Sequence, residues 1–285
     1  MTTLDDDPGR LRSVAEALAT EAAAFVRRRR TEVFDADHPG AAAVRAKSTP
    51  TDPVTVVDTD TERLLRGRLA QLRPGDPVLG EEGGGPADAP GAVTWVLDPI
   101  DGTVNFVYGI PAYAVSIAAR VDGVSVAGAV ADVVGGRVYS AGVGLGAHVV
   151  DQRGASPLRC SAVDDLSMAL LGTGFGYAAR RRAVQAAVLA KLLPVVRDVR
   201  RIGSAALDLC MVAAGRLDAF YEHGLHVWDL AAGSLIAAEA GARVLLPDLD
   251  HPAGGSGLTI AAAPGIADEL TAALQRFGGL DPMPD

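Results

Sequence analysis

The pattern of apolar residues changes near residue 150, and this change limits the possible folds more than any other feature. Over residues 112–150, β-like runs are interrupted at Asp122-Gly123, Gly135-Gly136 and Gly144–Gly146, which is typical of an antiparallel meander. From about residue 160, short apolar runs alternate with helical segments, which favours a layered α/β arrangement. We therefore predict an α/β protein with an α+β first half and an α/β second half.

Two helices and two short strands are expected before the meander. Apolar residues recur at helical spacing from Arg10 to about Arg30, and the run Arg27–Arg30 is interpreted as a solvated helix end. Residues 35–53 read as loop. Thr59 and Glu62 match a capping box, which predicts a helix from Thr59 to about Leu72. The apolar runs at 78–79 and 93–97 predict strands.

The second half is predicted to contain strands and helices in alternation. The expected strands are 168–171, one near 199, 217–221, 242–246 and 258–262, and the expected helices are 181–196 and those starting at 204, at 229 and after 264. We divide the chain into a disordered leader (1–9), an N-terminal α+β subdomain (10–152) and a C-terminal α/β subdomain (153–285), with the boundary within 151–157.

The charge balance restricts the partners of the chain. Its 285 residues include 35 Asp and Glu against 26 Lys and Arg, for a net charge of -9. An acidic chain lacks the field that attracts proteins to nucleic acid or to anionic membranes, so neither partner is expected. The two cysteines are not in a metal-binding pattern, and no signal peptide or long apolar stretch is present. A cytoplasmic protein is predicted.

The segment WVLDPIDGTVNF (95–106) is the most informative for chemistry. An apolar strand ends at Asp98, Pro99 favours an extended Asp98, and Asp101-Gly102-Thr103 forms a turn that can start a helix. Two carboxylates beside free backbone N–H groups suit a divalent cation next to a phosphate. Asp-Pro and Asp-Gly are also ordinary turn dipeptides, so this segment alone leaves both interpretations open.

Other acidic residues strengthen the metal-site interpretation when they are taken together. Glu81 and Glu82 end another short strand, where exposed turn acids are the alternative, while Asp58 and Asp229 stand at helix starts, where N-caps are the alternative. Two like charges 4 Å apart repel by about 4 kcal/mol at an effective dielectric of 20. Four converging carboxylates would therefore need cations in order to stay ionised together.

Several segments resemble motifs of the inositol monophosphatase family, most closely its bacterial SuhB-type branch. In chain order the matching segments are PVTVVDTDTE (53–62), GEE (80–82), WVLDPIDGTVNF (95–106), RRIGSAALDL (200–209) and WDLAAGSLIAAEAG (228–241). They follow the order of the family, and with Lys47 they span residues 47–241. The resemblance therefore covers nearly the whole chain.

The resemblance implies a layered αβαβα sandwich, commonly a homodimer, that hydrolyses phosphate monoesters with two or three Mg²⁺ ions per site. By position, Glu81, Asp98 and the carbonyl of Ile100 resemble ligands of a first metal. Asp98, Asp101 and Asp229 resemble ligands of a second. Glu81 and Asp58 resemble the surroundings of a third, weaker metal. Inhibition by lithium is also implied.

The resemblance further implies substrate contacts. Asp101, Gly102 and Thr103 match the phosphate-binding turn. Residues matching contacts to the alcohol portion or lining the site are Gly203, Ser204, Ala205, Glu222, Asp229 and Lys47. For Lys47, a solvated loop lysine is the alternative.

The expected reaction is in-line attack of a metal-activated water on myo-inositol 1-phosphate. Glu81, and Thr103 hydrogen-bonded to Asp58, are the expected catalytic groups. Fructose-1,6-bisphosphatase or histidinol-phosphatase activity is the alternative within enzymes, and a regulatory binding protein that retains the fold is the alternative outside them. The arginines at 180–182 and 200–201 are the only features that favour the binding protein.

Two other features, a histidine pair and a cysteine, are interpreted as structural and not catalytic or metal-binding. His223 and His226 could suggest zinc, but no cysteine or further histidine lies nearby in the sequence. Cys210 lies among apolar residues of an expected helix and is predicted to be a core thiol.

Overall fold

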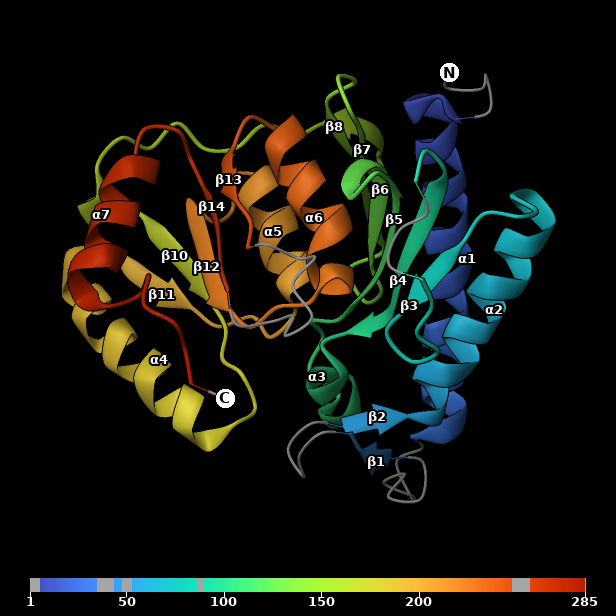
Figure 1. The fold of residues 1–285 in the computed structure, drawn as a ribbon, viewed down its shortest axis with the longest axis horizontal. Helices are drawn as coiled ribbons and strands as arrows, with labels where there is room; N and C mark the ends of the chain where they lie inside the picture. The colour runs from blue at the N-terminus through green and yellow to red at the C-terminus, as the bar shows by residue number, and fades with distance from the viewer. Residues whose placement is uncertain (1–5, 35–43, 48–52, 87–89, 248–256, 285) are drawn as a thin grey trace.

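Two β-sheets alternate with three pairs of helices in the computed structural model, which describes residues 6–34, 44–47, 53–86, 90–247 and 257–284. The layers run from α1 (Pro8–Val33) and α2 (Val56–Leu72) through a seven-stranded sheet, α5 (Ala205–Ala213) and α6 (Val227–Glu239), and a five-stranded sheet to α4 (Ala179–Leu192) and α7 (Ala267–Phe277) (Figure 1). The predicted αβαβα layering is confirmed.

The larger sheet contains the predicted meander. In spatial order its strands are β3 (Val78–Gly80), β4 (Val93–Asp101), β5 (Ala114–Val121), β6 (Val124–Asp132), β7 (Arg137–Gly142), β8 (Ala147–Asp151) and β9 (Gly154–Pro157). Only β3 and β4 pair in parallel. The subdomain boundary expected within 151–157 falls in the β8–β9 hairpin, where Asp151 pairs with Gly154, and β9 is the last strand of this sheet.

The smaller sheet belongs to the second half. Its spatial order is β11 (Asp198–Arg200), β10 (Leu170–Thr173), β12 (Ala219–His223), β14 (Leu258–Ala262) and β13 (Arg243–Leu245). β10 pairs in parallel with β11 and β12, whereas β14 runs antiparallel to β12 and β13. The strand expected from Met168 starts at Leu170, because residues 166–168 form a 3₁₀ turn capped by Asp165.

Each interface between neighbouring layers has its own buried apolar cluster. Trp95 and Leu97 of β4 face α1 and α2, whereas Val96 faces α5 and α6. Phe220 of β12 faces α5 and α6, and Tyr221 faces α4 and α7. This alternation follows from the two-residue period of a strand, and it fixes which face of β4 can present a polar side chain to α6. Within the described ranges, no helix has the length and apolar character needed to cross a membrane.

The first two helices begin earlier than expected. The Asp7 side chain caps α1 by accepting hydrogen bonds from the backbone N–H groups of residues 9 and 10 (3.0 and 3.2 Å), so residues 8 and 9 are helical and not part of a leader. Asp6 of the expected leader pairs with Arg73 (2.6 Å), and residues 1–5 lie outside the described residues. The predicted Thr59–Glu62 capping box is wrong: Thr55 and Asp58 form it, and the Thr59 hydroxyl bonds back to the Val56 carbonyl (3.1 Å).

Of the four arginines expected to form a solvated helix end, Arg28 is largely exposed (63%), whereas the other three bind other elements. Arg27 donates to the carbonyl of Val133 (2.8 Å), and Arg30 donates to the carbonyl of Phe106 (3.0 Å) and lies over its ring. Arg29 pairs with Asp60 of α2 (2.9 Å). The cations therefore attach α1 to α2, to the end of β6 and to α3 (Thr103–Tyr108).

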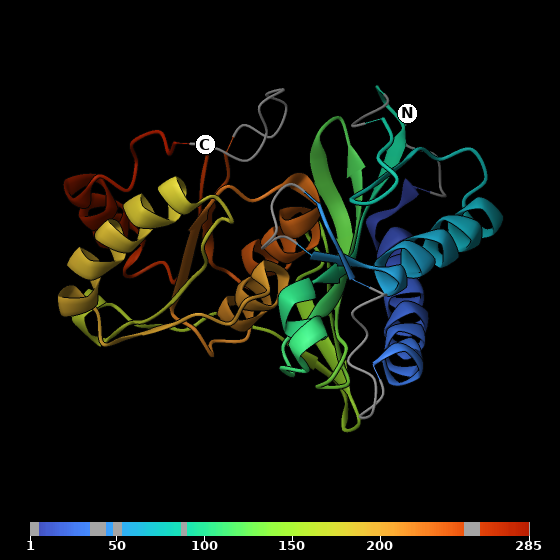
Figure 2. The same ribbon diagram turned by 90° about the horizontal axis from the view of Figure 1, so that it is seen from below.

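A short antiparallel pair lies in the segment that was expected to be loop. Strands β1 (Val44–Ala46) and β2 (Pro53–Thr55) pair with each other, and Figure 2 shows them beside α3 and the start of α2. The remainder of the expected loop, 35–43 and 48–52, lies outside the described residues. The pair places Lys47 next to the end of β3.

Candidate active site

A β-bulge at the end of β4 brings two aspartates to one face of the sheet. Asp98 is two residues after Val96 and therefore lies on the same face of β4, the face toward α6. Its partner across the strand pair is Ser116 of β5. Asp101 is opposite Ala114, so three steps along β4 match two steps along β5. The extra residue in β4 returns Asp101 to the face that Asp98 occupies. Without this bulge the two carboxylates would point to opposite faces.

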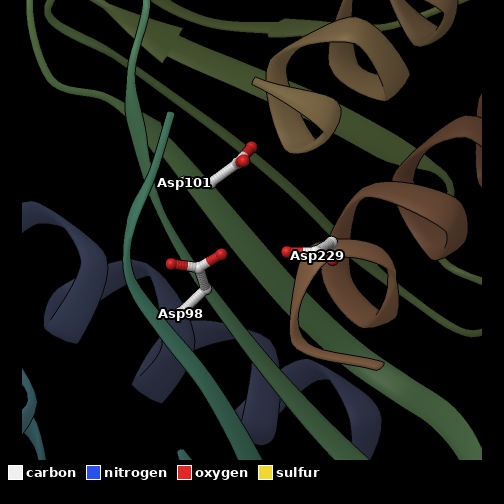
Figure 3. Close-up of side chains that lie close together, drawn as sticks. All are labelled: Asp98, Asp101 and Asp229. Carbon is white, nitrogen blue, oxygen red and sulfur yellow. The ribbon is translucent and has the colours of Figure 1, made fainter. Parts of the chain in front are cut away.

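The third aspartate comes from the first turn of α6. Asp229 accepts a hydrogen bond from the backbone N–H of His226 (2.6 Å) in a capping box, which fixes its carboxylate at the helix start. One oxygen from each of Asp98, Asp101 and Asp229 lies within 4.8 Å of the other two. Figure 3 shows these side chains directed into one space between β4 and α6. We call this group the three-aspartate cluster.

Burial and mutual repulsion perturb the whole three-aspartate cluster. Burial, reinforced by the charges of Glu81 and of the other two aspartates, raises the pKa of Asp98 well above its usual range. Burial, reinforced by the charges of Asp101 and Glu81 and opposed by the hydrogen bond from His226, also raises the pKa of Asp229 well above its usual range. Burial raises the pKa of Asp101 to about 6, although hydrogen bonds oppose the shift. Three carboxyl groups this close together, with Asp98 fully buried and Asp229 half-buried, are stabilised when a cation lies between them.

The start of α5 holds Asp101 in place. Its Oδ2 accepts hydrogen bonds from the Ser204 hydroxyl (2.6 Å) and the Ala206 backbone N–H (2.7 Å). Ser204 also caps α5 by accepting from the Leu207 N–H (3.3 Å). Ser204, which was predicted to contact substrate, therefore binds Asp101 in this structure, while Ala205 and Gly203 line the adjacent cavity.

Glycine is required at two of the predicted site positions, Gly102 and Gly203. Gly102 has φ +94°, and a Cβ there would approach the carbonyl oxygens of Ala112 and Gly203 to 3.0 Å. Gly203 also has φ +94°, and a Cβ would lie 2.3 Å from the Arg201 guanidinium. Positive φ and close backbone approach both exclude a side chain. The start of α3 and the loop before α5 can therefore lie against each other.

Thr103 and Asp58 are joined as the sequence predicts. The Thr103 hydroxyl lies 3.2 Å from Oδ1 of Asp58 and 3.0 Å from the carbonyl of Ile100. The other oxygen of Asp58 accepts from the backbone N–H and hydroxyl of Thr55 (2.9 and 2.5 Å). Burial, opposed by the Thr55 hydrogen bonds and reinforced by the charges of Glu82 and Glu81, raises the pKa of Asp58 to about 7.

Glu81 borders the three-aspartate cluster but is turned toward a lysine. Lys47 Nζ lies 2.7 Å from Oε1 of Glu81 and 2.5 Å from Oε1 of Glu82. Partial burial opposes the charge of Lys47, but the two adjacent carboxylates outweigh it and raise the pKa of Lys47. Lys47 is thus an ion-pairing residue of the site wall and not a solvated loop lysine.

A cavity of about 600 Å³ opens beside the three-aspartate cluster. Every predicted metal-ligand and substrate-binding residue except Asp58 lines it, including Glu222 of β12. Burial, opposed by the charge of Arg201 and reinforced by that of Asp101, raises the pKa of Glu222 to about 8. The cavity is in the size range of small-molecule sites.

The donor set fits a divalent metal ion. Buried carboxylate oxygens are the hard ligands that Mg²⁺ and similar cations prefer, and their mutual repulsion gives the cation a stabilising role. The three-aspartate cluster is the only such group of His, Cys, Asp and Glu found in the described part of the chain. The two histidines considered for zinc each have another partner: His223 Nε2 contacts the Gly279 carbonyl (2.6 Å), and His226 stacks on Trp228.

Some site residues escaped the sequence analysis. Arg201, Arg181 and Trp228 line the cavity. Arg201 and Trp228 lie in the matched motifs and Arg181 in a basic cluster, but none of the three was among the predicted site residues. Arg181 donates to the carbonyl of Pro284 (3.0 Å) and so joins the start of α4 to the C-terminal segment. Cys210 is a buried free thiol of the core, as predicted. A signal for Arg201 was available, because it directly precedes the Ile202–Gly203 turn.

Comparison with known proteins decides the family. The profile of the inositol monophosphatase family matches residues 7–279. The chain belongs to the inositol monophosphatase family. It is therefore a member of a phosphatase family, and the metal-compatible cluster lies within the matched region. The predicted enzyme class and the resemblance are confirmed.

Relatives and solved structures agree with this family assignment. The "Inositol-1-monophosphatase" of Mycobacterium leprae is 75% identical over 291 residues, covering 100% of both chains. The solved structure of Mycobacterium tuberculosis SuhB is 68% identical, with a TM-score of 0.83 over 97% of this chain and 100% of that one. The "Nus factor SuhB" of Pasteurella multocida is 40% identical, covering 79% of this chain and 83% of its own.

Proposed function

We propose that this member of the inositol monophosphatase family is a Mg²⁺-dependent hydrolase that releases phosphate from myo-inositol 1-phosphate. The observation that carries the proposal is the buried three-aspartate cluster beside a small-molecule cavity. The name of the Mycobacterium leprae relative, which matches over the full chain, supports the substrate.

The proposed metal ligands come from the residues around the cluster. Asp98, Asp101 and Asp229 would hold one Mg²⁺. A second ion would be held by Asp98, Glu81 and the carbonyl of Ile100. A third, weaker ion would lie near Glu81 and Asp58. When bound, these ions would offset the charge of the carboxylates and of the phosphate, and polarise the ester for in-line displacement. Lys47 bonds Oε1 of Glu81 and also has Glu82 as a partner, so Glu81 would offer Oε2 to a metal, or both oxygens once its carboxylate turns from Lys47.

The chain itself would orient and deprotonate the attacking water. The Thr103 hydroxyl already bonds Asp58 at 3.2 Å, so it can accept a hydrogen bond from the water while it donates to Asp58. We propose that the proton passes through Thr103 to Asp58 with help from Glu81. A general base works best when its pKa lies near the operating pH, and burial raises the pKa of Asp58 to about 7.

The leaving oxygen and the alcohol portion would face α6 and β12. We propose that a water held by Asp229 protonates the leaving oxygen, and that the helix start at Ser204 and Ala205 lies against the alcohol. Glu222 would hydrogen-bond ring hydroxyls from the cavity wall. No covalent phosphoenzyme is part of this scheme, because no step needs a protein nucleophile.

The Glu222→Gln variant tests the polyol contact. At a pH above the raised pKa of Glu222, where its carboxylate is ionised, losing a hydrogen bond to a charged group costs about 1.5–3 kcal/mol, so we expect KM for inositol 1-phosphate to rise about tenfold or more, with a smaller change in kcat. Hydrolysis of p-nitrophenyl phosphate, which has no ring hydroxyls, should keep its KM. The exposed Glu269→Gln is the matched control. An equal loss on both substrates would show that Glu222 does not contact the polyol.

Phosphate release across a substrate panel tests the proposed function. The panel contains inositol 1-phosphate, fructose 1,6-bisphosphate, histidinol phosphate and adenosine 3',5'-bisphosphate, each with Mg²⁺ and with a chelator. We expect inositol 1-phosphate to give the highest kcat/KM, and only with Mg²⁺. No turnover of inositol 1-phosphate beside clear turnover of another compound would overturn the substrate assignment.

Further properties are proposed together with this activity. We propose inhibition by lithium, a homodimeric state and a cytoplasmic location. A regulatory role is the alternative, and the name of the Pasteurella multocida relative is the observation that favours it. Two of the arginines that favoured a binding protein already have partners within the chain: Arg200 pairs with Asp198 (2.6 Å), and Arg181 donates to the carbonyl of Pro284.

A further inference from the structure

Glu62 is a buried carboxylate that the proposed mechanism does not use. Its side chain is only 4% exposed, on the inner face of α2. It is four residues after Asp58, so the two acids occupy the same face of the helix. Asp58 binds Thr103 from this face, whereas Glu62 reaches the turn that follows β3.

The backbone of that turn is held by Glu62. Oε2 of Glu62 accepts a hydrogen bond from the N–H of Glu82 (2.8 Å), and Oε1 accepts from the N–H of Gly83 (2.9 Å). The N–H of Glu81 itself bonds the Leu97 carbonyl of β4 (3.1 Å). Glu81 is therefore fixed on one side by the sheet and on the other by Glu62, through the two residues that follow it.

Arg66 completes the attachment. Its Nε donates to Oε1 of Glu62 (2.7 Å), and its two terminal nitrogens donate to the carbonyls of Val78 (3.3 Å) and Gly84 (2.5 Å). One guanidinium thus joins the start of β3, the end of the turn and the acid that holds its middle. The buried charge of Glu62 is satisfied by three donors, which is the condition for a stable buried carboxylate.

Two glycines make room for this contact. A Cβ on Gly80 would lie 2.4 Å from the Glu62 carboxyl carbon, and one on Gly83 would lie 2.6 Å from Oε1. Neither glycine has a positive φ, so close approach of Glu62 and not backbone conformation excludes a side chain. The Gly-Glu-Glu-Gly sequence is thus shaped to the Glu62 carboxylate.

We propose that Glu62, with Arg66, is a positioning residue that holds Glu81 in place for metal binding. One face of α2 would then position two groups of the site: Asp58 would fix the Thr103 hydroxyl, and Glu62 would fix the Glu81 carboxylate. This inference rests on the proposed function, because Glu81 matters only if the site binds metal. In Glu62→Gln the amide NH₂ must face a backbone N–H or the guanidinium, so one of the three hydrogen bonds is replaced by a donor–donor contact.

The test is metal binding by the full chain, measured apart from activity. Mn²⁺ binding is followed by the EPR signal of the free ion, together with the Mg²⁺ concentration that gives half-maximal phosphate release. Residues that orient metal ligands typically change metal affinity about 10–100-fold, so we expect Glu62→Gln to weaken Mn²⁺ binding about tenfold or more. The half-saturating Mg²⁺ concentration should rise in parallel, and saturating Mg²⁺ should restore most of kcat.

Two further variants make the result decisive. Glu21→Gln removes another Glu–Arg pair to α2, the exposed contact of Glu21 with Arg68 (2.9 Å), and should leave Mn²⁺ affinity unchanged. Arg66→Gln should weaken Mn²⁺ binding in the same direction as Glu62→Gln, and it carries the test if Glu62→Gln does not fold.

The outcomes separate this inference from the proposed function. A lower Tm with wild-type Mn²⁺ affinity in the folded variants would show that Glu62 serves stability alone, and would overturn the inference while leaving the proposed function intact. A wild-type chain that neither binds Mn²⁺ nor hydrolyses phosphate esters would overturn both.

Discussion

Asp98→Asn is expected to remove nearly all Mg²⁺-dependent phosphate release. Asp98 is the one aspartate proposed to contact both strong metal positions, and an amide can supply neither the charge nor both oxygens of a carboxylate. Loss of a residue that merely supports a ligand costs up to about 100-fold, so we expect a decrease in kcat/KM of more than about 100-fold. The measurement is phosphate release from inositol 1-phosphate at saturating Mg²⁺.

The same variant should be more stable than the wild type when metal is absent. Asp98 is buried beside Glu81, Asp101 and Asp229, whose charges raise its pKa, so its removal relieves repulsion. The exposed Asp164→Asn is the control and should change neither activity nor stability. An Asp98→Asn protein that kept wild-type turnover would contradict the proposed metal site. One that lost turnover but kept full cellular function would favour a regulatory role.

The metal-free protein is expected to lose stability as the pH rises toward 8. A carboxyl whose pKa is raised on folding binds its proton more tightly in the folded chain, so the folded state carries more protons between the two pKa values and stability falls as pH rises through that window. The window runs from the ordinary carboxyl range to about 6 for Asp101, about 7 for Asp58 and about 8 for Glu222. The shift of Asp101 from 3.8 to about 6 corresponds to about 3 kcal/mol by itself.

Urea unfolding between pH 5.5 and 8 measures this dependence. With a chelator present, we expect the free energy of unfolding to fall steadily across the range. Excess Mg²⁺ should flatten the curve, because bound metal stabilises the ionised carboxylates. Asp98→Asn should show a shallower slope than the wild type in the chelator. A metal-free wild type that becomes more stable as the pH rises would contradict the buried, like-charged site.

The elements and the meander were predictable because they follow from local patterns, whereas the αβαβα layering was implied by the family resemblance. The alternation around Trp95 and Val96 places one side of β4 on each neighbouring layer, and the turn pairs of residues 112–150 mark the meander. The pairing of Gly154–Pro157 with β8 was not predictable, because this segment is short and exposed and looks like a linker. Backbone pairing of a short exposed edge leaves little trace in the side chains.

The convergence of the acids was predictable in part. The sequence shows that strands or helices begin and end at Asp98, Asp101 and Asp229, but the β-bulge that aligns Asp98 with Asp101 is visible only in the register with β5. The pairs Thr55–Asp58 and Thr59–Glu62 both fit a capping pattern. In the structure Thr55 and Asp58 form the capping box, and Glu62 instead accepts a hydrogen bond from the turn that follows β3. The choice depended on tertiary contacts that the local sequence does not encode.

The contacts of the arginines near residue 30 were not predictable for the same reason. A cation at a helix end is equally compatible with solvent and with a carbonyl from another element. The partners of Arg27 and Arg30, the carbonyls of Val133 and Phe106, are distant in sequence. Only the packing of α1 across the sheet brings them together.

The most direct test of the central claim is an anomalous difference map from crystals of the full chain grown with Mn²⁺. We predict strong peaks within coordination distance of Asp98, Asp101 and Asp229, with Glu81 turned from Lys47 toward the metal. Crystals of Asp98→Asn grown in the same way should lose these peaks. Catalytically active wild-type protein with no anomalous peak at the three-aspartate cluster would contradict the account.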